Sequence, residues 1–281
     1  MIPQSPAVSV VVPTRDRPGA LVECLEALAR QTASSFDVVV VDDASRDAHA
    51  VAEVVERFPN VRVVRGEGRG PAAARNLGAM ESNAPVVCFT DDDCRPAPSW
   101  IATIQDAFAD GATVVAGSTV AVDGHTCAVA SQLITNHLVD WSRTADGSSV
   151  GFAPSCNVAC TRAAFTVVPF DEHYPLAAGE DREWCTRVTA AGMTITFAPD
   201  AAVLHDPDTT VGAFWRQQVR YGRGAHQFHR SIASTERIPP AAFYRGLART
   251  ALHHGPAIAG LVAVAQVATA IGYAQAALAA R

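Results

Sequence analysis

The N-terminal part of the chain alternates short apolar runs with amphipathic segments. Residues 8–12 and 37–41 are apolar runs, and the segment between them carries Leu21, Leu25 and Leu28 at helical spacing. A second cycle has the same form, with "AHAVAEVVERF" and "GPAAARNLGAMES" as helices and "VRVV" and "PVVCFT" as strands. Apolar strands that alternate with helices predict an α/β fold with a mostly parallel central sheet covered on both faces.

The pattern changes after Trp100. The stretches "ATVVAGSTVAV" and "MTITFAP" predict strands, and "EDREWCTRVTAAG" predicts a helix that ends at Gly192. The stretch "FWRQQVRYGRGAHQFHR" predicts a basic helix, or a helix followed by a loop. Residues 245–281 are rich in alanine and predict a C-terminal helical extension.

Composition narrows the possible functions. The 281 residues are 49% hydrophobic and 18% charged, which is typical of a globular chain with a sizeable core. All basic residues are arginine, so Schiff-base and Walker-type chemistry, which need lysine, are excluded. A net charge of -6 without a dense basic block argues against nucleic acid as the partner. The seven cysteines contain no CxxC pair and indicate reduced thiols in a cytoplasmic protein.

Polar clusters follow the predicted strands of the first half. They lie at residues 14–16, 42–43, 65–69 and 91–93, each directly after one apolar run. Ligands of such sheets bind in the crevice outside the carboxyl ends of the strands. We therefore expect these clusters to share one ligand site.

The stretch "FTDDDCRP" carries the strongest chemical signal. Three adjacent carboxylates repel one another, and a divalent cation with oxygen ligands would neutralise them. Mg²⁺ needs only one or two carboxylates, which Asp91 and Asp93 or two neighbours among the three would provide. The alternative is a solvated acidic turn.

The remaining motifs each have a structural alternative. Asp42 and Asp43 suit a base or ribose contact, or equally an Asx turn or helix cap. The stretch "RGEGRGPAAARNLG" is either a phosphate cradle at a helix N-terminus or a tight turn. Glu180 and Asp181 are either a general base and its neighbour or helix-capping acids, and His205 alone is more often structural.

Taken in order, these motifs resemble those of one enzyme family. The stretches "SVVVPTRDRP", "VVVVDDASRD", "GRGPAAARNLG", "CFTDDDCRPAPSW", "PSCNVACTRAAF", "AAGEDREW" and "TFAPDAAVLH" resemble those of family 2 glycosyltransferases, which have the GT-A (Rossmann-like, nucleotide-diphospho-sugar transferase) fold. The resemblance runs in register from about Val8 to His205.

The resemblance implies roles for the residues at the nucleotide. It implies that Asp43 and the backbone at Pro13, Thr14 and Arg15 hold the nucleoside. The other expected nucleotide contacts are Asp42, Arg69, Arg75, Asp91 and Asp92, although Asp92 has a structural role as its alternative.

The resemblance also implies the metal and catalytic residues. Asp93 is expected to bind the metal directly, His205 to complete the metal site, and Asp91 to lie near a metal-bound water or the ribose. Asp181 is the expected base, with Glu180 beside it as a catalytic or acceptor contact. Asn157 is expected to line the acceptor pocket.

The implied reaction moves a sugar, with inversion, from a nucleotide-diphosphate sugar to an acceptor hydroxyl. The implied cofactor is Mn²⁺ or Mg²⁺, with a UDP-sugar favoured as donor, and the acceptor is a saccharide, a lipid-linked saccharide, a natural product or a peptide. A sugar-nucleotide nucleotidylyltransferase and a non-catalytic nucleotide-sugar-binding module are the alternatives. The first normally carries a lysine, and the second would be expected to lose Asp93 or Asp181.

The sequence leaves alternative roles open for the basic helix and for the C-terminal tail. The basic stretch departs from the Gln-x-x-Arg-Trp signature of processive synthases, and Arg216, Arg220 and Arg223 either close over the diphosphate, hold an anionic acceptor, or form a solvated face. We expect a catalytic domain over 1–235, with nucleotide-binding and acceptor-binding halves at about 1–98 and 99–235. Residues 256–280 carry no formal charge, so the tail 236–281 either contacts the inner face of the membrane or packs on the domain.

Overall fold

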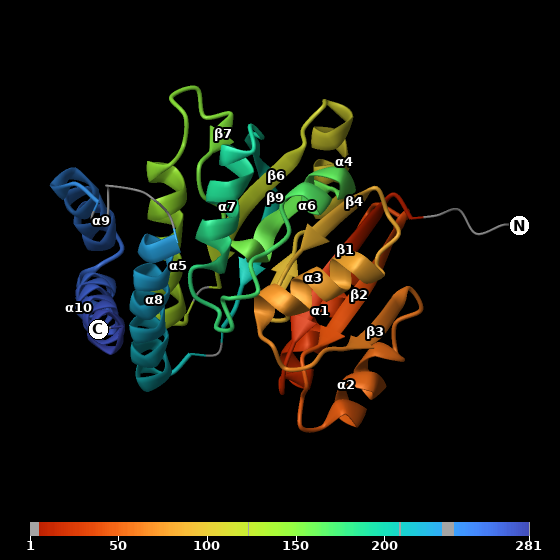
Figure 1. The fold of residues 1–281 in the computed structure, drawn as a ribbon, viewed down its shortest axis with the longest axis horizontal. Helices are drawn as coiled ribbons and strands as arrows, with labels where there is room; N and C mark the ends of the chain where they lie inside the picture. Colours follow the sequence, from red (N-terminus) through yellow and green to blue (C-terminus); the bar gives the residue numbers. More distant parts are fainter. Residues whose placement is uncertain (1–5, 123, 208, 232–238, 281) are drawn as a thin grey trace, which may run out of the picture.

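A computed structural model describes residues 6–122, 124–207, 209–231 and 239–280. The N-terminal half alternates strands and helices as predicted (Figure 1). Its elements are β1 (Val8–Thr14), α1 (Pro18–Ala29), β2 (Phe36–Asp42), α2 (Ala48–Val55), β3 (Val61–Arg65), α3 (Pro71–Glu81), β4 (Val86–Phe89), β5 (Cys94–Pro96) and α4 (Trp100–Ala109). Strands β3, β2, β1 and β4 are neighbours and pair in parallel.

The second half extends the same sheet with strands of both directions. Its elements are β6 (Val114–Ala121), α5 (Thr126–Trp141), β7 (Ser149–Val150), η1 (Ser155–Asn157), β8 (Val158–Thr161), α6 (Arg162–Val167), α7 (Glu180–Ala190), β9 (Ile195–His205), α8 (Val211–Ser231), α9 (Ala241–His253) and α10 (Pro256–Ala279). Strands β6 and β9 pair in parallel, whereas β5, β7 and β8 run antiparallel to their partners. The α/β fold is confirmed, and parallel pairing dominates only in the first half.

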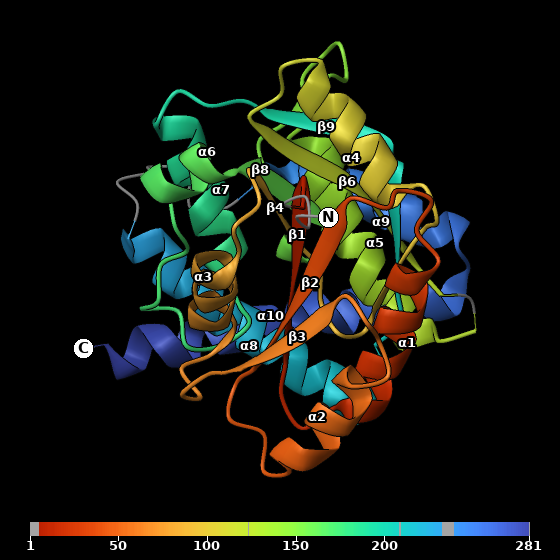
Figure 2. The ribbon, with the colours of Figure 1, turned by 90° about the vertical axis from the view of Figure 1, so that its right-hand side faces the viewer.

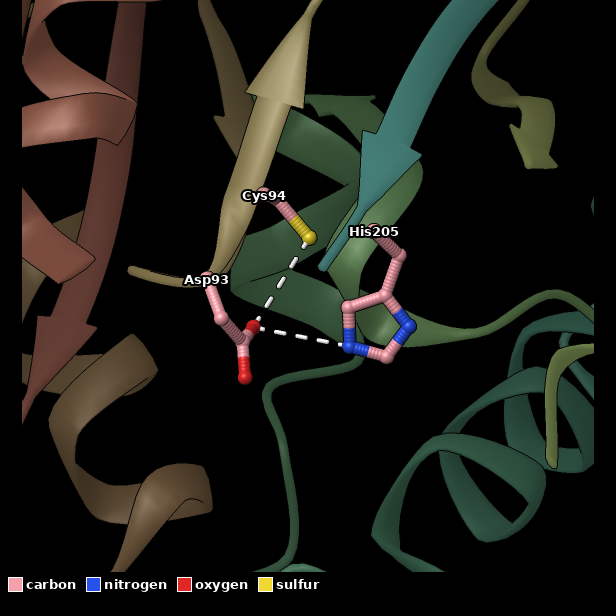
Figure 3. A group of neighbouring side chains, drawn as sticks. All are labelled: Asp93, Cys94 and His205. Carbon is pink, nitrogen blue, oxygen red and sulfur yellow. Dashed lines mark hydrogen bonds and ion pairs between the residues drawn. The ribbon is translucent and has the colours of Figure 1, made fainter. Parts of the chain in front are cut away.

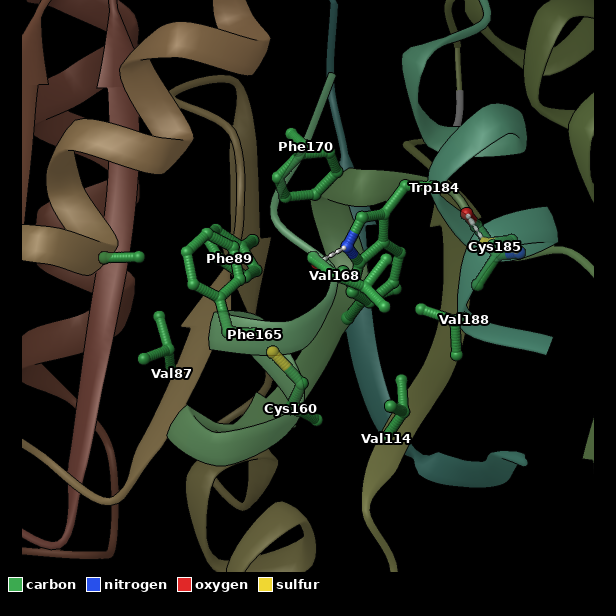
Figure 4. Close-up of a cluster of buried hydrophobic side chains, with 14 of the residues drawn as sticks. Val87, Phe89, Val114, Cys160, Phe165, Val168, Phe170, Trp184, Cys185 and Val188 are labelled. Carbon is green, nitrogen blue, oxygen red and sulfur yellow. Dashed lines mark hydrogen bonds between the residues drawn. The ribbon is translucent and has the colours of Figure 1, made fainter. Parts of the chain in front are cut away.

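Alternation along the strands builds a core on each face of the sheet. Val11 and Val39 face one cluster, while Val10 and Val38 face the other. Helices α3, α6 and α7 lie on one side and α1 and α4 on the other (Figure 2). The first cluster includes a group of aromatic rings from β4, α6, α7 and the loop between α6 and α7 (Figure 4), in which Phe170 of that loop stacks on Trp184 at 5.1 Å between ring centroids. This packing fixes α7, the helix that begins at the acidic pair.

The predicted extension forms α9 and α10, which join α5 and α8 in a helical layer at one end of the molecule (Figure 1). Helices α8 and α10 approach so closely that their crossing needs glycine. A Cβ at Gly222 would lie 2.0 Å from the Thr269 carbonyl oxygen, and one at Gly272 would lie 1.9 Å from that of Val219. Helix α10 of the tail is therefore packed on α8. The expected domain boundary between residues 235 and 236 lies outside the described residues.

Candidate active site

Strand pairing brings Asp93 and His205 together. In the antiparallel pair of β5 and β9, Cys94 lies opposite His205, so the residue before β5 meets the last residue of β9. The Asp93 Oδ1 atom lies 3.5 Å from His205 Nε2, and both side chains are largely buried. Figure 3 shows the carboxylate turned toward the imidazole. The predicted metal residues Asp93 and His205 thus face each other although 112 positions apart in the chain.

The imidazole of His205 is held from its other side. Its Nδ1 atom lies 2.9 Å from Oε1 of Gln132 on α5, which leaves Nε2 for Asp93 or a metal. Burial by itself would lower the pKa of His205, but the hydrogen bond and charge of Asp93 outweigh it and raise the pKa to about 9. Gln132 therefore acts as a positioning residue for the candidate metal ligand.

The thiol of Cys94 adjoins the same pair, but Mn²⁺ and Mg²⁺ favour oxygen ligands over thiolate sulfur. Its sulfur lies 4.0 Å from Asp93 Oδ1, in one cluster with Asp93 and His205 (Figure 3). Burial raises the pKa of Cys94 well above its usual value, so the sulfur stays a neutral thiol. Cys94 belongs to the core behind the site.

Asp92 is the buried member of the triplet. Its Oδ2 atom accepts a 2.7 Å hydrogen bond from the Thr14 hydroxyl at the end of β1, and its Oδ1 atom is paired with the guanidinium of Arg17. Arg17 also donates to Asp93 Oδ2 at 2.8 Å. Burial raises the pKa of Asp92 to about 7. Asp92 and Thr14 therefore link β1 to the acidic turn. These contacts agree with a structural role for Asp92, which was the alternative to a nucleotide contact.

Asp91 points instead toward a buried arginine. Arg75 of α3 donates from Nη2 to Asp91 at 2.7 Å and from Nη1 to Glu180 at 3.3 Å. The Arg75 side chain is only 3% exposed and lies over the Phe170 ring. Arg75 thus links the acidic turn to the start of α7, and its expected contact with the nucleotide stays a prediction.

The two acids at the start of α7 differ in their surroundings. Glu180 is buried against Arg75, and burial raises its pKa to about 7. Asp181 is partly exposed and accepts a hydrogen bond from the backbone N–H of Arg182, and burial raises its pKa while the charge of Arg75 opposes the rise. Asp181 is therefore the more accessible of the two acids, and its role as the base stays a prediction.

A cleft of about 510 Å³ opens at the acidic turn. Its walls include all three aspartates of the triplet, His205 and Arg17, which come from the sheet side. Helix α8 forms another wall, with Gln217, Arg220 and Tyr221. The position of the cleft outside the ends of β4 and β9 agrees with the expected ligand rim.

Asp42 and Asp43, the second acidic pair, hold two loops in place by accepting hydrogen bonds from backbone N–H groups. Asp42 accepts from the backbone N–H of Ser45, three residues on, and pairs with Arg65. The Asp43 carboxylate accepts backbone N–H groups from Gly68, Arg69 and Gly70 at 2.9–3.1 Å.

The glycine-rich loop therefore closes on Asp43, and its N–H groups are not free to cradle a phosphate. Arg69 pairs with Glu172, whereas Arg15 is exposed beside Gly68. Pro13 lies in β1 one residue before Thr14. A contact of Asp43 or Arg15 with the nucleoside stays a prediction.

Asn157 does not line the cleft, which corrects its assignment to the acceptor pocket. Its side chain is fully buried, with Oδ1 accepting from the Trp100 indole at 2.8 Å. Its Nδ2 atom donates to the carbonyls of Ser118 and Ala201. Both of its N–H donors and its oxygen are therefore used in joining α4 to the sheet.

Arg17 and Gln217 in the cleft, and Gln132 behind His205, were not among the site residues predicted from the sequence. Arg17 follows the first predicted strand but was not itself singled out, and Gln132 lies on α5, a helix that carries none of the recognised motifs. Gln217 and Arg220 do keep the Gln-x-x-Arg spacing of the processive signature, with Tyr221 at its fifth position. That spacing was the available signal for this wall of the cleft.

Comparison with known proteins places the chain in an enzyme family. The model of glycosyl transferase family 2 matches residues 9–146, and that of glycosyl transferase family group 2 matches residues 86–279. The glycosyltransferase AglE of Haloferax volcanii is 30% identical over 233 residues, which cover 79% of this chain and 74% of AglE. The chain belongs to the family 2 glycosyltransferases.

More distant relatives and solved structures agree. The pre-mycofactocin glycosyltransferase of Mycobacterium tuberculosis is 28% identical over 78% of this chain, which spans 46% of that relative. A mannosyltransferase from Pyrobaculum calidifontis, solved with GDP-Man and Mn²⁺, superposes with a TM-score of 0.63 at 21% identity, covering 99% of this chain and 80% of that one. S. aureus TarS with UDP gives 0.58 at 18% identity, covering 98% and 91%. The chain has the GT-A fold and is a glycosyltransferase.

Proposed function

We propose that the protein transfers a sugar from a nucleotide-diphosphate sugar to an acceptor hydroxyl and inverts the anomeric configuration. The observation that carries the proposal is the convergence of Asp93, His205 and Arg220 on one cleft whose acidic turn is linked through Arg75 to Glu180, the residue before Asp181. GDP-Man in the mannosyltransferase structure, and UDP or UDP-GlcNAc in the TarS structures, support this donor class. A UDP-sugar and a GDP-sugar both have a precedent there.

The residues present fit a divalent cation. A carboxylate and an imidazole face each other beside an open cleft, which is a donor set that Mn²⁺ accepts and Mg²⁺ tolerates. Asp93 and His205 would hold the ion, and Asp91 lies on the same turn near its outer side. The bound cation would supply positive charge that stabilises the departing diphosphate. Arg220, on the opposite wall of the cleft, adds a permanent positive charge.

Asp181 accepts the proton in the proposed reaction. The acceptor oxygen forms a bond to the anomeric carbon as the bond from that carbon to the diphosphate oxygen breaks, and the hydroxyl proton moves to the Asp181 carboxylate. One displacement leaves the product with inverted configuration. The raised pKa of Asp181 makes its carboxylate a stronger base than an ordinary aspartate.

The family assignment favours this reaction over the two alternatives. A sugar-nucleotide nucleotidylyltransferase belongs to a different family, and the chain lacks the lysine that such enzymes normally carry. A silent binding module has no reason to retain Asp93 and Asp181, or the ion pairs that hold Asp93 in place.

A donor screen tests the proposal. UDP-, GDP- and dTDP-sugars would each be added with Mn²⁺ or Mg²⁺, and the rise in melting temperature recorded. We expect one base to stabilise the protein in a metal-dependent manner, Asp93→Asn to abolish that effect, and the exposed control Asp110→Asn to retain it. The anomeric configuration of the product, read by NMR, would be opposite to that of the donor. Stabilisation without added metal in both variants would contradict the metal site.

We also propose that α10 contacts the inner face of the membrane. Its length and mean hydropathy of 1.8 are those of a membrane span, and also of a core helix, yet only 28% of that window is buried. The exposed face is apolar at Val264, Val267 and Ile271, which suits a helix that lies on a bilayer. In co-sedimentation with anionic vesicles, Val264→Glu/Val267→Glu would lower the bound fraction severalfold, while Met80→Glu on α3 would not. Equal binding of all three proteins would refute the membrane contact.

A further inference from the structure

Helix α8 carries a row of arginines without acidic partners. Arg216, Arg220, Arg223 and Arg230 follow the spacing i, i+4, i+7 and i+14, which places them on one side of the helix. None of the four forms an ion pair with a carboxylate of the described residues, whereas most arginines of the N-terminal half do. Their hydrogen bonds go to neutral oxygens, from Arg220 to the Ala177 carbonyl and from Arg223 to the Gln275 side chain.

Three of these arginines line a second pocket of about 520 Å³. It lies between α8, the segment that precedes α7 and the last turns of α10, which Figures 1 and 2 show beside α8. Arg220, Arg223 and Arg230 supply its charge, and Leu176, Ala276 and Ala280 supply an apolar wall. Among the described residues no carboxylate lines it. A volume of this size is in the range of small-molecule sites, roughly 300–1,000 Å³.

Arg220 connects this pocket to the active site, because its side chain lines both. The two cavities are also fixed relative to the acids of α7. A Cβ on Gly224 would lie 2.2 Å from the Ala178 carbonyl oxygen, so α8 is packed directly on the residues before Glu180 and Asp181. A molecule seated in the second pocket would therefore lie at a constant distance from the proposed base.

We propose that this pocket is the acceptor subsite, and that it binds an acceptor carrying a phosphate or diphosphate next to an aliphatic group. Guanidinium groups stay charged and bind phosphate oxygens through paired N–H donors. The apolar wall beside them fits an aliphatic chain rather than a second polar group. This inference rests on the proposed transfer reaction for the role of the bound molecule.

The donor diphosphate is the competing occupant, and the positions of the charges argue against it. The candidate metal ligands line the first cleft with Arg220 alone among these arginines. Arg223 and Arg230 lie beyond Arg220, in the pocket that contains none of the acidic turn. Replacing Arg223 and Arg230 therefore tests the acceptor subsite without touching the donor site.

Calorimetric titration of the full chain with decyl phosphate, kept below its micelle concentration, tests the subsite. We expect one bound molecule, and in Arg223→Gln/Arg230→Gln an affinity lower by about tenfold or more, because charged hydrogen bonds to the phosphate are lost. The control Arg245→Gln/Arg249→Gln removes two exposed arginines of α9 that form no ion pair within the described part of the chain, and it should bind within about twofold of the wild type. Arg223→Lys/Arg230→Lys, which keeps the charge, should recover part of the loss.

Further titrations distinguish the source of the phosphate and the competing site. Inorganic phosphate should bind through the same arginines but more weakly than decyl phosphate, and equal affinity would remove the aliphatic part of the proposal. The donor nucleotide with Mn²⁺ should bind the Arg223→Gln/Arg230→Gln variant as it binds the wild type. Loss of nucleotide binding in that variant, no decyl phosphate binding, or an equal loss in the α9 control would overturn the subsite. None of these titrations requires transfer, so their failure is separable from failure of the proposed reaction.

Discussion

Replacing Arg75 with methionine removes the charge that joins the acidic turn to α7. The side chain is 3% exposed, so Asp91 and Glu180 would be left next to an apolar group in place of a guanidinium. Breaking a buried ion pair by removing one partner costs about 3–5 kcal/mol. In a domain of this size such a loss lowers the melting temperature by about 6–20 °C.

The loss of stability caused by Arg75→Met should depend on pH, and the pKa of Glu180 sets the direction of that dependence. Its value in the folded protein, about 7, lies above the ordinary value of 4.5, so the folded state binds the extra proton and stability falls as pH rises through this window. At pH 5 the Glu180 carboxyl is largely neutral, and losing Arg75 matters less there. At pH 8 it must ionise beside methionine, and the difference between variant and wild type should be larger.

Urea denaturation at pH 5 and pH 8 measures both effects. Arg187→Met is the matched control, because Arg187 pairs with Glu183 on the same helix but is one-third exposed, and its loss should cost about 1 kcal/mol or less. If Arg75→Met unfolded at the wild-type urea concentration, or lost more stability at pH 5 than at pH 8, the buried link between the acidic turn and α7 would be refuted.

Three further predictions address the packing and the candidate metal site. Gly272→Ala should destabilise the protein by about 1–3 kcal/mol, because the added methyl group overpacks on Val219. The control Gly260→Ala has open space around it and should be neutral or slightly stabilising. Thermal unfolding compares the two variants, and equal melting temperatures would contradict the close α8–α10 crossing. Gln132→Leu should weaken Mn²⁺ binding by about tenfold or more because His205 loses its orienting partner, and calorimetry giving the wild-type affinity would refute that role. Asn157→Leu should lower the melting temperature while leaving the affinity for the donor unchanged, and a specific loss of acceptor binding at full stability would restore its place in the acceptor pocket.

The elements that the sequence predicted well are those whose signal is local. The apolar runs and helical spacings of the first half located β1 to β4 and α1 to α3, because period and polarity depend on neighbours in the chain. The acidic turn after β4 was likewise visible as a break in an apolar run. The mixed direction of the second half was not visible, since pairing partners such as β5 and β9 are set by tertiary contacts.

The site residues show the same contrast between local sequence signals and tertiary contacts. Asp93 and His205 were named from motifs, and the strand register explains why they meet. The buried contacts of Asn157 and Arg75 could not be predicted from the sequence, because a polar residue type does not show whether its side chain faces a ligand or forms hydrogen bonds in the core. Gln132 has no sequence signal at all, since its role depends on α5 passing beside the end of β9.

The rate of sugar transfer by Asp181→Asn, at saturating donor and metal, tests the central claim most directly. Amide and carboxylate are nearly isosteric, so the variant should fold and bind the donor with wild-type affinity, while losing the group that accepts the proton. We expect the turnover rate to fall by about 10²–10⁴-fold, with Asp110→Asn at the wild-type rate. A normal rate in Asp181→Asn would show that another group takes the proton and that the proposed active site is misassigned.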